Sequence, residues 1–86
     1  MQETTEYHRR YLRAINNPTR RMILRCLQGG CQTISALTVT TGLDAPTVRW
    51  HLDVLEHGFC VEKALRNGDV PYHLTQEGEV INFLDD

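Results

Sequence analysis

Glycine, proline and asparagine divide this chain into short segments, and this punctuation constrains the fold more than any other feature. Gly29-Gly30, Gly42 and Gly58 each follow a stretch with apolar residues at helical spacing. Glycine favours helix ends because it adopts backbone conformations that other residues avoid. No apolar run between these breaks is long enough to span a membrane. The 86 residues, of which 41% are hydrophobic, therefore predict one small domain with a single core.

The first part of the chain predicts two helices separated by Asn17-Pro18. Helical spacing of apolar residues favours one helix over residues 6–15, so residues 1–5 are expected to form a flexible N-terminal tail of the single domain, residues 1–86. Asn17 is a favoured N-cap, and proline is tolerated at the first helical position because its missing N–H would be unpaired there anyway. The second helix therefore follows Pro18 and ends at the glycine pair.

A three-residue break, Thr41-Gly42-Leu43, separates two further predicted helices. Thr33 can cap the first of them and Asp44 the second, since both side chains accept hydrogen bonds from free backbone N–H groups. Two helices joined by a short turn that contains glycine form the helix-turn-helix unit.

The apolar period then changes from the helical value to two, which predicts strands over residues 59–65 and 69–74. Asn67-Gly68 between them is a strong signal for a β-hairpin. A last helix, capped by Thr75, completes the chain. The predicted fold class is mainly α with a small β-hairpin wing, a winged helix-turn-helix in the order α-α-α-turn-α-β-β-α.

The fourth predicted helix has two distinct faces. Val48, Leu52 and Leu55 recur at helical spacing and should face the core. On the opposite face, Arg49 could donate two hydrogen bonds to a guanine in the DNA major groove. An exposed Trp50 would indicate a contact or packing against a neighbouring helix. Arg49 can equally be a solvated helix residue and Trp50 part of the core edge, although an arginine at the hairpin tip favours DNA.

The formal net charge of -2 hides an uneven distribution. Residues 7–43 contain six arginines and no acidic residue, whereas residues 44–86 contain three basic and nine acidic residues. The arginine-rich half could contact DNA phosphates, with the second helix partly at DNA and the first mostly at a subunit contact. Alternatively, the arginines form salt bridges, individually worth little, with acidic residues of the last helix. These are Glu77, Glu79, Asp85 and Asp86.

Three stretches of the chain have a distinctive order and spacing. They are Asn17-Pro18-Thr19-Arg20-Arg21-x-Ile23-Leu24, then Asp44-Ala45-Pro46-Thr47-Val48-x-x-His51-Leu52-x-x-Leu55-x-x-Gly58, then Tyr72-x-Leu74-Thr75-x-x-Gly78. Together they resemble the ArsR-type winged helix-turn-helix regulators of bacteria and archaea, over residues 7–84. The resemblance implies a small homodimeric transcription factor whose first and last helices form the dimer. It also implies that the helix over residues 44–57 reads the major groove and that the hairpin is the wing.

The candidate DNA-binding residues lie on the fourth helix, the hairpin and the second helix. They are Ala45, Pro46, Thr47, Arg49, Trp50, Arg66, Asn67, Arg20 and Arg21. The last helix carries an apolar stripe that is wider than one packed face needs, which suggests a second copy of the chain as its partner. The candidate dimer residues on the first and last helices are Tyr7, Tyr11, Val80, Ile81, Phe83 and Leu84.

The cysteines predict neither a metal site nor a cofactor. Metal-sensing members of the resembling family carry a Cys-x-Cys pair where this chain has Thr33 and Ser35. Cys26, Cys31 and Cys60 show no zinc-ligand or disulfide spacing and indicate a reducing cytoplasm. Cys26 and Cys60 fall at inward positions, where a thiol is usually inert, whereas Cys31 leaves a single-thiol redox sensor open.

We therefore predict a cytoplasmic, sequence-specific transcriptional regulator, a repressor that binds double-stranded DNA as a homodimer on a pseudo-palindromic site. An enzyme is not expected, since His51 is interpreted as a packing or hydrogen-bonding residue and no catalytic triad is visible. The effector stays unidentified. The alternative is a winged-helix module that binds a protein instead of DNA, which the acidic balance and an exposed Trp50 would suit. A small thiol-based enzyme or sensor using Cys31 ranks last.

Overall fold

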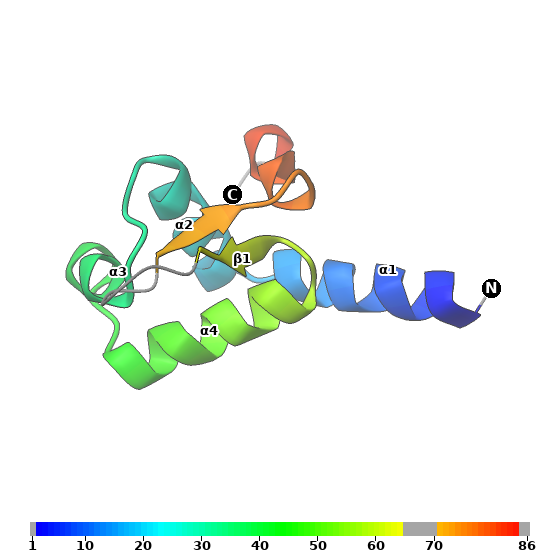
Figure 1. Cartoon of the computed structure of the whole chain (residues 1–86), viewed down its shortest axis with the longest axis horizontal. Helices are drawn as coiled ribbons and strands as arrows, with labels where there is room; N and C mark the ends of the chain where they lie inside the picture. The colour runs from blue at the N-terminus through cyan, green and yellow to red at the C-terminus, as the bar shows by residue number, and fades with distance from the viewer. Residues whose placement is uncertain (1, 65–70, 85–86) are drawn as a thin grey trace.

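A computed structural model describes residues 2–64 and 71–84, which form four α-helices, a two-stranded sheet and a C-terminal 3₁₀-helix (Figure 1). The elements in chain order are α1 (Gln2–Ile15), α2 (Pro18–Gln28), α3 (Ile34–Thr41), α4 (Ala45–His57), β1 (Val61–Lys63), β2 (Tyr72–Leu74) and the 3₁₀-helix η1 (Glu77–Phe83). In Figure 1, α4 runs along one side of the molecule, and η1, drawn in orange to red, lies on the opposite side. This order confirms the predicted winged helix-turn-helix.

Three helices begin at the capping residues that the sequence predicts. Asn17 Oδ1 accepts a hydrogen bond from Arg20 N at 3.0 Å, and Thr33 Oγ1 accepts one from Ala36 N at 3.2 Å. Asp44 Oδ1 accepts one from Thr47 N at 3.0 Å. Each bond satisfies a backbone N–H group that the first turn of a helix leaves without an internal partner.

The turn between α3 and α4 depends on Gly42. Its φ of 78° lies in the left-handed region, where a residue with a Cβ atom is strained. Its N–H donates to Thr38 O at 2.9 Å, which closes the last turn of α3. The chain then reverses into α4, so the helix-turn-helix is present as expected.

The core lies between α2 and the elements around it, since α2 contacts α1, α3, α4, β2 and η1. The predicted inward face of α4 is confirmed, because its three apolar positions are fully buried. On α2 the inward residues are Ile23, Leu24 and Leu27, whereas Met22 is exposed. The largest fully buried side chains are Ile23, Leu24, Leu37, Val48, Leu52, Leu55, Val61 and Cys60.

Several element boundaries differ from the sequence prediction. α1 begins at Gln2, so residues 2–5 are helical and not a tail, which fits a segment without glycine or proline. The strands are shorter than residues 59–65 and 69–74. Phe59 has a φ of 69° and cannot extend β1. The last helix is a 3₁₀-helix, and the expected hairpin tip lies outside the described residues.

The two strands pair antiparallel, with Val61 opposite Leu74 and Lys63 opposite Tyr72. β2 is not free on its other edge. Tyr72 N donates to Gln32 O at 2.7 Å, and Gln32 lies in the loop between α2 and α3. The base of the hairpin is therefore attached to the helix-turn-helix by a backbone hydrogen bond.

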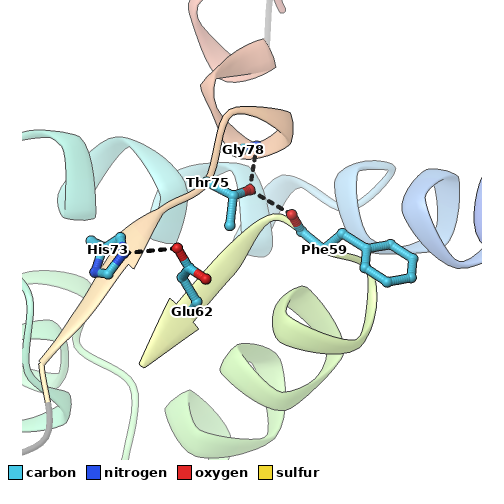
Figure 2. A network of polar contacts seen from close by, with 5 residues as sticks. All are labelled: Phe59, Glu62, His73, Thr75 and Gly78. Carbon is cyan, nitrogen blue, oxygen red and sulfur yellow. Dashed lines mark hydrogen bonds and ion pairs between the residues drawn. The ribbon is translucent and has the colours of Figure 1, made fainter. Parts of the chain in front are cut away.

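Thr75 connects the end of β2 to the start of β1 and to η1 (Figure 2). Its hydroxyl donates to Phe59 O and accepts from Gly78 N at 3.1 Å, which is the contact expected of a capping residue. Its own N–H donates to Cys60 O at 3.0 Å. Across the hairpin, His73 Nε2 lies 3.1 Å from Glu62 Oε1. These contacts position the C-terminal segment against the strands.

Gly78 allows η1 to approach the backbone at Cys60, because a Cβ atom at this position would overlap the Cys60 carbonyl oxygen. We predict that Gly78→Ala lowers the free energy of unfolding by about 1–3 kcal/mol, the usual cost of overpacking. Urea denaturation followed by circular dichroism measures this change. Gly29→Ala is the matched control, since a Cβ atom there would make only ordinary contacts, the nearest at 3.5 Å. Equal stabilities of the two variants would contradict the prediction.

Candidate nucleic-acid interface

The N-terminal half of α4 presents the predicted DNA-binding side chains outward. Pro46 and Arg49 are exposed, and Ala45 and Thr47 are half-buried. Among the described residues, Arg49 has no hydrogen-bond or ion-pair partner. The guanidinium group of Arg49 is thus available to a ligand that approaches this face.

Trp50 is partly exposed to solvent and is also packed against neighbouring residues. Its side chain is 52% exposed, so it does not belong to the core edge. Its ring also packs against its neighbours, with 4.9 Å between the centroids of Trp50 and His51 and 5.8 Å between the Arg20 guanidinium and the Trp50 ring. Trp50 is therefore held in place on one side and open to solvent on the other.

Arg20, a predicted DNA contact, is instead buried inside the protein, with 6% of its surface exposed. Its Nε donates to Ala14 O and one terminal nitrogen donates to Arg13 O, both at 2.9 Å. The other terminal nitrogen lies 3.2 Å from His51 Nδ1. The prediction for Arg20 is wrong because the last carbonyl groups of α1 need partners and a guanidinium group can reach two of them at once.

Arg21 also caps α1, although its side chain is only half-buried. Its Nε donates to Ile15 O at 2.7 Å, and a terminal nitrogen donates to Asn16 Oδ1 at 3.4 Å. Positive charge at this end of α1 is also favourable because the C-terminus of a helix carries partial negative charge. The side chain of Arg21 is therefore engaged at the C-terminal end of α1.

His51 is neutral in this arrangement. Arginine only donates hydrogen bonds, so the contact with Arg20 requires Nδ1 to accept and the ring proton to reside on Nε2. Burial, and then the positive charge of Arg20, hold the pKa of His51 below its ordinary value. The expectation that His51 is a hydrogen-bonding histidine is confirmed.

Two arginines of α1 that the sequence did not single out lie beside α4. Arg10 and Arg13 border a hollow of about 300 Å³ that Trp50, Asp53, Val54 and His57 complete. Arg10 Nε donates to His57 O at 2.9 Å. The spacing of Arg10 and Arg13, three residues apart on one helix face, was the available signal. Only the packing of α1 on α4 shows that this face adjoins Trp50.

Several described arginines donate hydrogen bonds to backbone carbonyl groups. Arg25 donates to Leu84 O at 3.0 Å, and Arg9 pairs with Glu6 of its own helix at 3.7 Å. Glu77 instead accepts from the hydroxyl of Tyr7 at 2.9 Å. Among the described contacts, arginines of this half therefore cap helix ends and pack between elements, whereas Asp85 and Asp86 lie outside the described residues.

The candidate dimer residues divide into three groups. Phe83 is 84% exposed on η1, and Tyr7 is exposed but stacks on Phe59 with ring centroids 4.1 Å apart. Ile81 is wrongly placed by the sequence in the interface, since it is 3% exposed and part of the core. The half-buried members are Tyr11, Val80 and Leu84.

Some predicted features cannot be compared with the structure. Arg66 and Asn67 on the wing lie outside the described residues. Within residues 2–64 and 71–84, no three His, Cys, Asp or Glu side chains are grouped so that they could hold a metal ion. None of the described helices has the length and apolar character needed to cross a membrane.

The neutral state of His51 makes stability depend on pH. The native pKa lies below the unfolded value of about 6.5, so the unfolded chain binds more protons between these two values. The free energy of unfolding should therefore fall as pH decreases through this window, with a slope of at most about 1.4 kcal/mol per pH unit from this group. We predict that His51→Gln, whose amide oxygen can still accept from Arg20, reduces that slope.

Urea denaturation at a series of pH values from neutral to mildly acidic tests this prediction. His8→Gln is the matched control, because His8 is exposed on α1 and should leave the wild-type slope unchanged. Identical slopes for the wild type and His51→Gln would show that His51 does not control the acid sensitivity.

Comparison with known proteins agrees with this geometry. Residues 15–63 match the helix-turn-helix domain family. No curated protein sequence matches the chain. A homodimeric winged helix-turn-helix DNA-binding domain from Mycobacterium bovis, a possible ArsR-family regulator, is 24% identical, with 95% of this chain and 75% of that chain covered and a TM-score of 0.82.

Two further solved structures have the same fold. The transcriptional repressor BigR from Xylella fastidiosa is 24% identical over 96% of this chain and 84% of its own, with a TM-score of 0.76. An ArsR family transcriptional regulator is 22% identical over 92% of this chain and 81% of its own, with a TM-score of 0.74. The chain thus belongs to the helix-turn-helix domain family, and its fold is that of the ArsR-like winged helix-turn-helix regulators.

Proposed function

We propose that this chain is a sequence-specific DNA-binding repressor that acts as a homodimer. The observation that carries the proposal is the outward face of α4, where Arg49 is exposed above three fully buried positions, Val48, Leu52 and Leu55. A helix that enters the major groove needs a rigid apolar side and a free polar side near its N-terminus. α4 has both.

Each outward side chain of α4 has a distinct role in this proposal. Arg49 donates two hydrogen bonds to O6 and N7 of a guanine. Thr47 contacts a base or a phosphate, and Ala45 and Pro46 are small enough for close approach to the groove. The Asp44 carboxylate serves as the cap of this helix: it accepts from Thr47 N, and its hydrogen bonds to Thr47 hold its pKa below the ordinary value, so it stays ionised.

Arg13 of α1 is the additional residue that we place at the interface. It is exposed beside Trp50 and could bind a phosphate next to the groove that α4 enters. Asp53 lies in the same hollow and repels phosphate, so we place the phosphate that Arg13 binds on the Trp50 side, away from the C-terminal half of α4. Arg20 is buried and Arg21 caps α1, so we do not propose either one as a primary phosphate contact.

A homodimer explains why so small a domain could select one site. Two copies of α4 would enter successive major grooves about 34 Å apart and read a pseudo-palindrome. The similar domain from Mycobacterium bovis is homodimeric, and the similar protein from Xylella fastidiosa is a repressor. Exposed Phe83 and the half-buried Tyr11, Val80 and Leu84 supply apolar surface from α1 and the C-terminal segment for the second copy.

A winged-helix module that binds a protein is the second candidate. The half-exposed Trp50 and the net charge of -2 favour it. Salt distinguishes the two functions, because each phosphate contact releases counterions and makes DNA binding weaken steeply as salt rises. A protein interface around Trp50 would lack that steep dependence.

We predict that Arg49→Ala costs about 1–3 kcal/mol of specific DNA binding and relaxes selectivity at one base position.

Arg13→Ala should weaken binding to all sequences and reduce the salt slope by about 1. Fluorescence anisotropy with DNA from upstream of the gene, at several salt concentrations, measures both. Arg9→Ala is the control, since Arg9 is paired with Glu6 near the start of α1. Absence of binding by the wild type would overturn the proposed function.

The dimer is tested with Phe83→Ser. Removing an exposed aromatic ring from a true interface should shift the chain towards monomer, which light scattering after gel filtration detects as a lower mass. Val39→Ser is the matched control, because Val39 is 85% exposed on α3, where no dimer contact is proposed. A wild-type chain that is monomeric at all concentrations, or equal effects of both variants, would reject this interface.

A further inference from the structure

The C-terminus of α2 brings two cysteines together. Gly30 has a φ of 106°, its N–H donates to Leu27 O at 3.1 Å, and Cys31 N donates to Cys26 O at 2.9 Å. This pair of backbone bonds around a left-handed glycine is the Schellman motif. In that motif, the two residues whose hydrogen bond spans six residues frequently pack their side chains against each other. Here both of those residues are cysteines.

The two thiols differ from the third cysteine in their surroundings. Cys26 and Cys31 are half-buried and pack against the outside of the core, whereas Cys60 is fully buried. Burial, and then the proximity of Cys31, raise the pKa of Cys26. Burial also raises the pKa of Cys60 to about 12, so that thiol stays protonated. Solvent and small oxidants therefore reach the pair but not Cys60.

We propose that Cys26 and Cys31 form an oxidation site at which a hydroperoxide converts the two thiols to an intrachain disulfide. The thiolate of Cys31 attacks one peroxide oxygen, so that an S–O bond forms and the O–O bond breaks. The leaving oxygen takes a proton, and with hydrogen peroxide this product is water. Cys26, after loss of its proton, attacks the Cys31 sulfur, which forms the S–S bond and expels the second oxygen as water. The thiols lose two electrons and two protons, and the peroxide is reduced.

The position of Cys31 connects this site to two other elements. Its Sγ lies 3.3 Å from Thr40 Oγ1 on α3. The next residue, Gln32, accepts the hydrogen bond from Tyr72 N that holds β2. Turning the Cys31 sulfur towards Cys26 removes the contact with Thr40 and changes the loop that carries Gln32. Oxidation should therefore alter the attachment of the hairpin as well as the end of α2.

Hydrogen peroxide added to the purified full chain tests the proposal. The expected result is the loss of two titratable thiols and of two hydrogens from the intact mass, both reversed by dithiothreitol. Trypsin cuts after Arg25 and Arg49 and leaves both cysteines in one peptide, residues 26–49, which should carry the mass loss. Cys60→Ser should form the same disulfide, whereas Cys26→Ser and Cys31→Ser should only gain oxygen on the remaining thiol of the pair.

A mass gain of oxygen on single thiols of the wild type, without loss of hydrogen, would overturn the disulfide. A disulfide that includes Cys60, or a disulfide between two chains, would also overturn the proposed Cys26–Cys31 disulfide. Hydrogen exchange at the amide of Tyr72 tests the connection to the hairpin separately, and we expect a several-fold change on oxidation. An unchanged exchange rate would limit the effect of the disulfide to α2. Neither measurement depends on DNA, so both remain decisive if the proposed function fails.

Discussion

The guanidinium group of Arg20 joins three helices, and the arrangement of the helix-turn-helix depends on it. It donates hydrogen bonds to two carbonyl groups at the C-terminal end of α1, and it contacts His51 of α4. Loss of solvent lowers the pKa of Arg20 only from an already high value, so the group keeps its charge and needs good acceptors. The described partners of Arg20 are neutral, two carbonyl oxygens and one imidazole nitrogen. These bonds connect α1 and α4 through α2, beside the apolar packing of Val48, Leu52 and Leu55 that directs Arg49 outward.

Much of the fold could be predicted because its signals are local. A cap at Asn17, Thr33 or Asp44 requires only a side chain and the backbone N–H groups of the next turn, so the sequence alone indicates it. The inward face of α4 is equally local, since three apolar residues at helical spacing leave one alternative face. Gly42 belongs to the same class because the turn needs a left-handed residue.

The errors concern residues whose role depends on distant parts of the chain. Arg20 suits a phosphate or a carbonyl group equally well, and only the end of α1 decides between them. The sequence predicts Ile81 in the dimer interface because the apolar stripe of its helix is wide, but Ile81 belongs to the core, where η1 packs on α2 and β2. Phe59 continues an apolar alternation in the sequence, yet it adopts a left-handed conformation that its stacking with Tyr7 and Arg10 accompanies. No pattern confined to neighbouring residues contains that information.

The hydrogen bond between Tyr72 and Gln32 affects how far the protein could change shape to fit a curved DNA ligand. Because it fastens the base of the hairpin to the loop before α3, it restricts movement of β2 relative to the helix-turn-helix. In the proposed complex, the DNA, and not the protein, would then have to deform when operators differ in shape. The stiffness of base steps that the protein never touches would contribute to affinity, and sites of equal base content could differ in occupancy through their bendability alone.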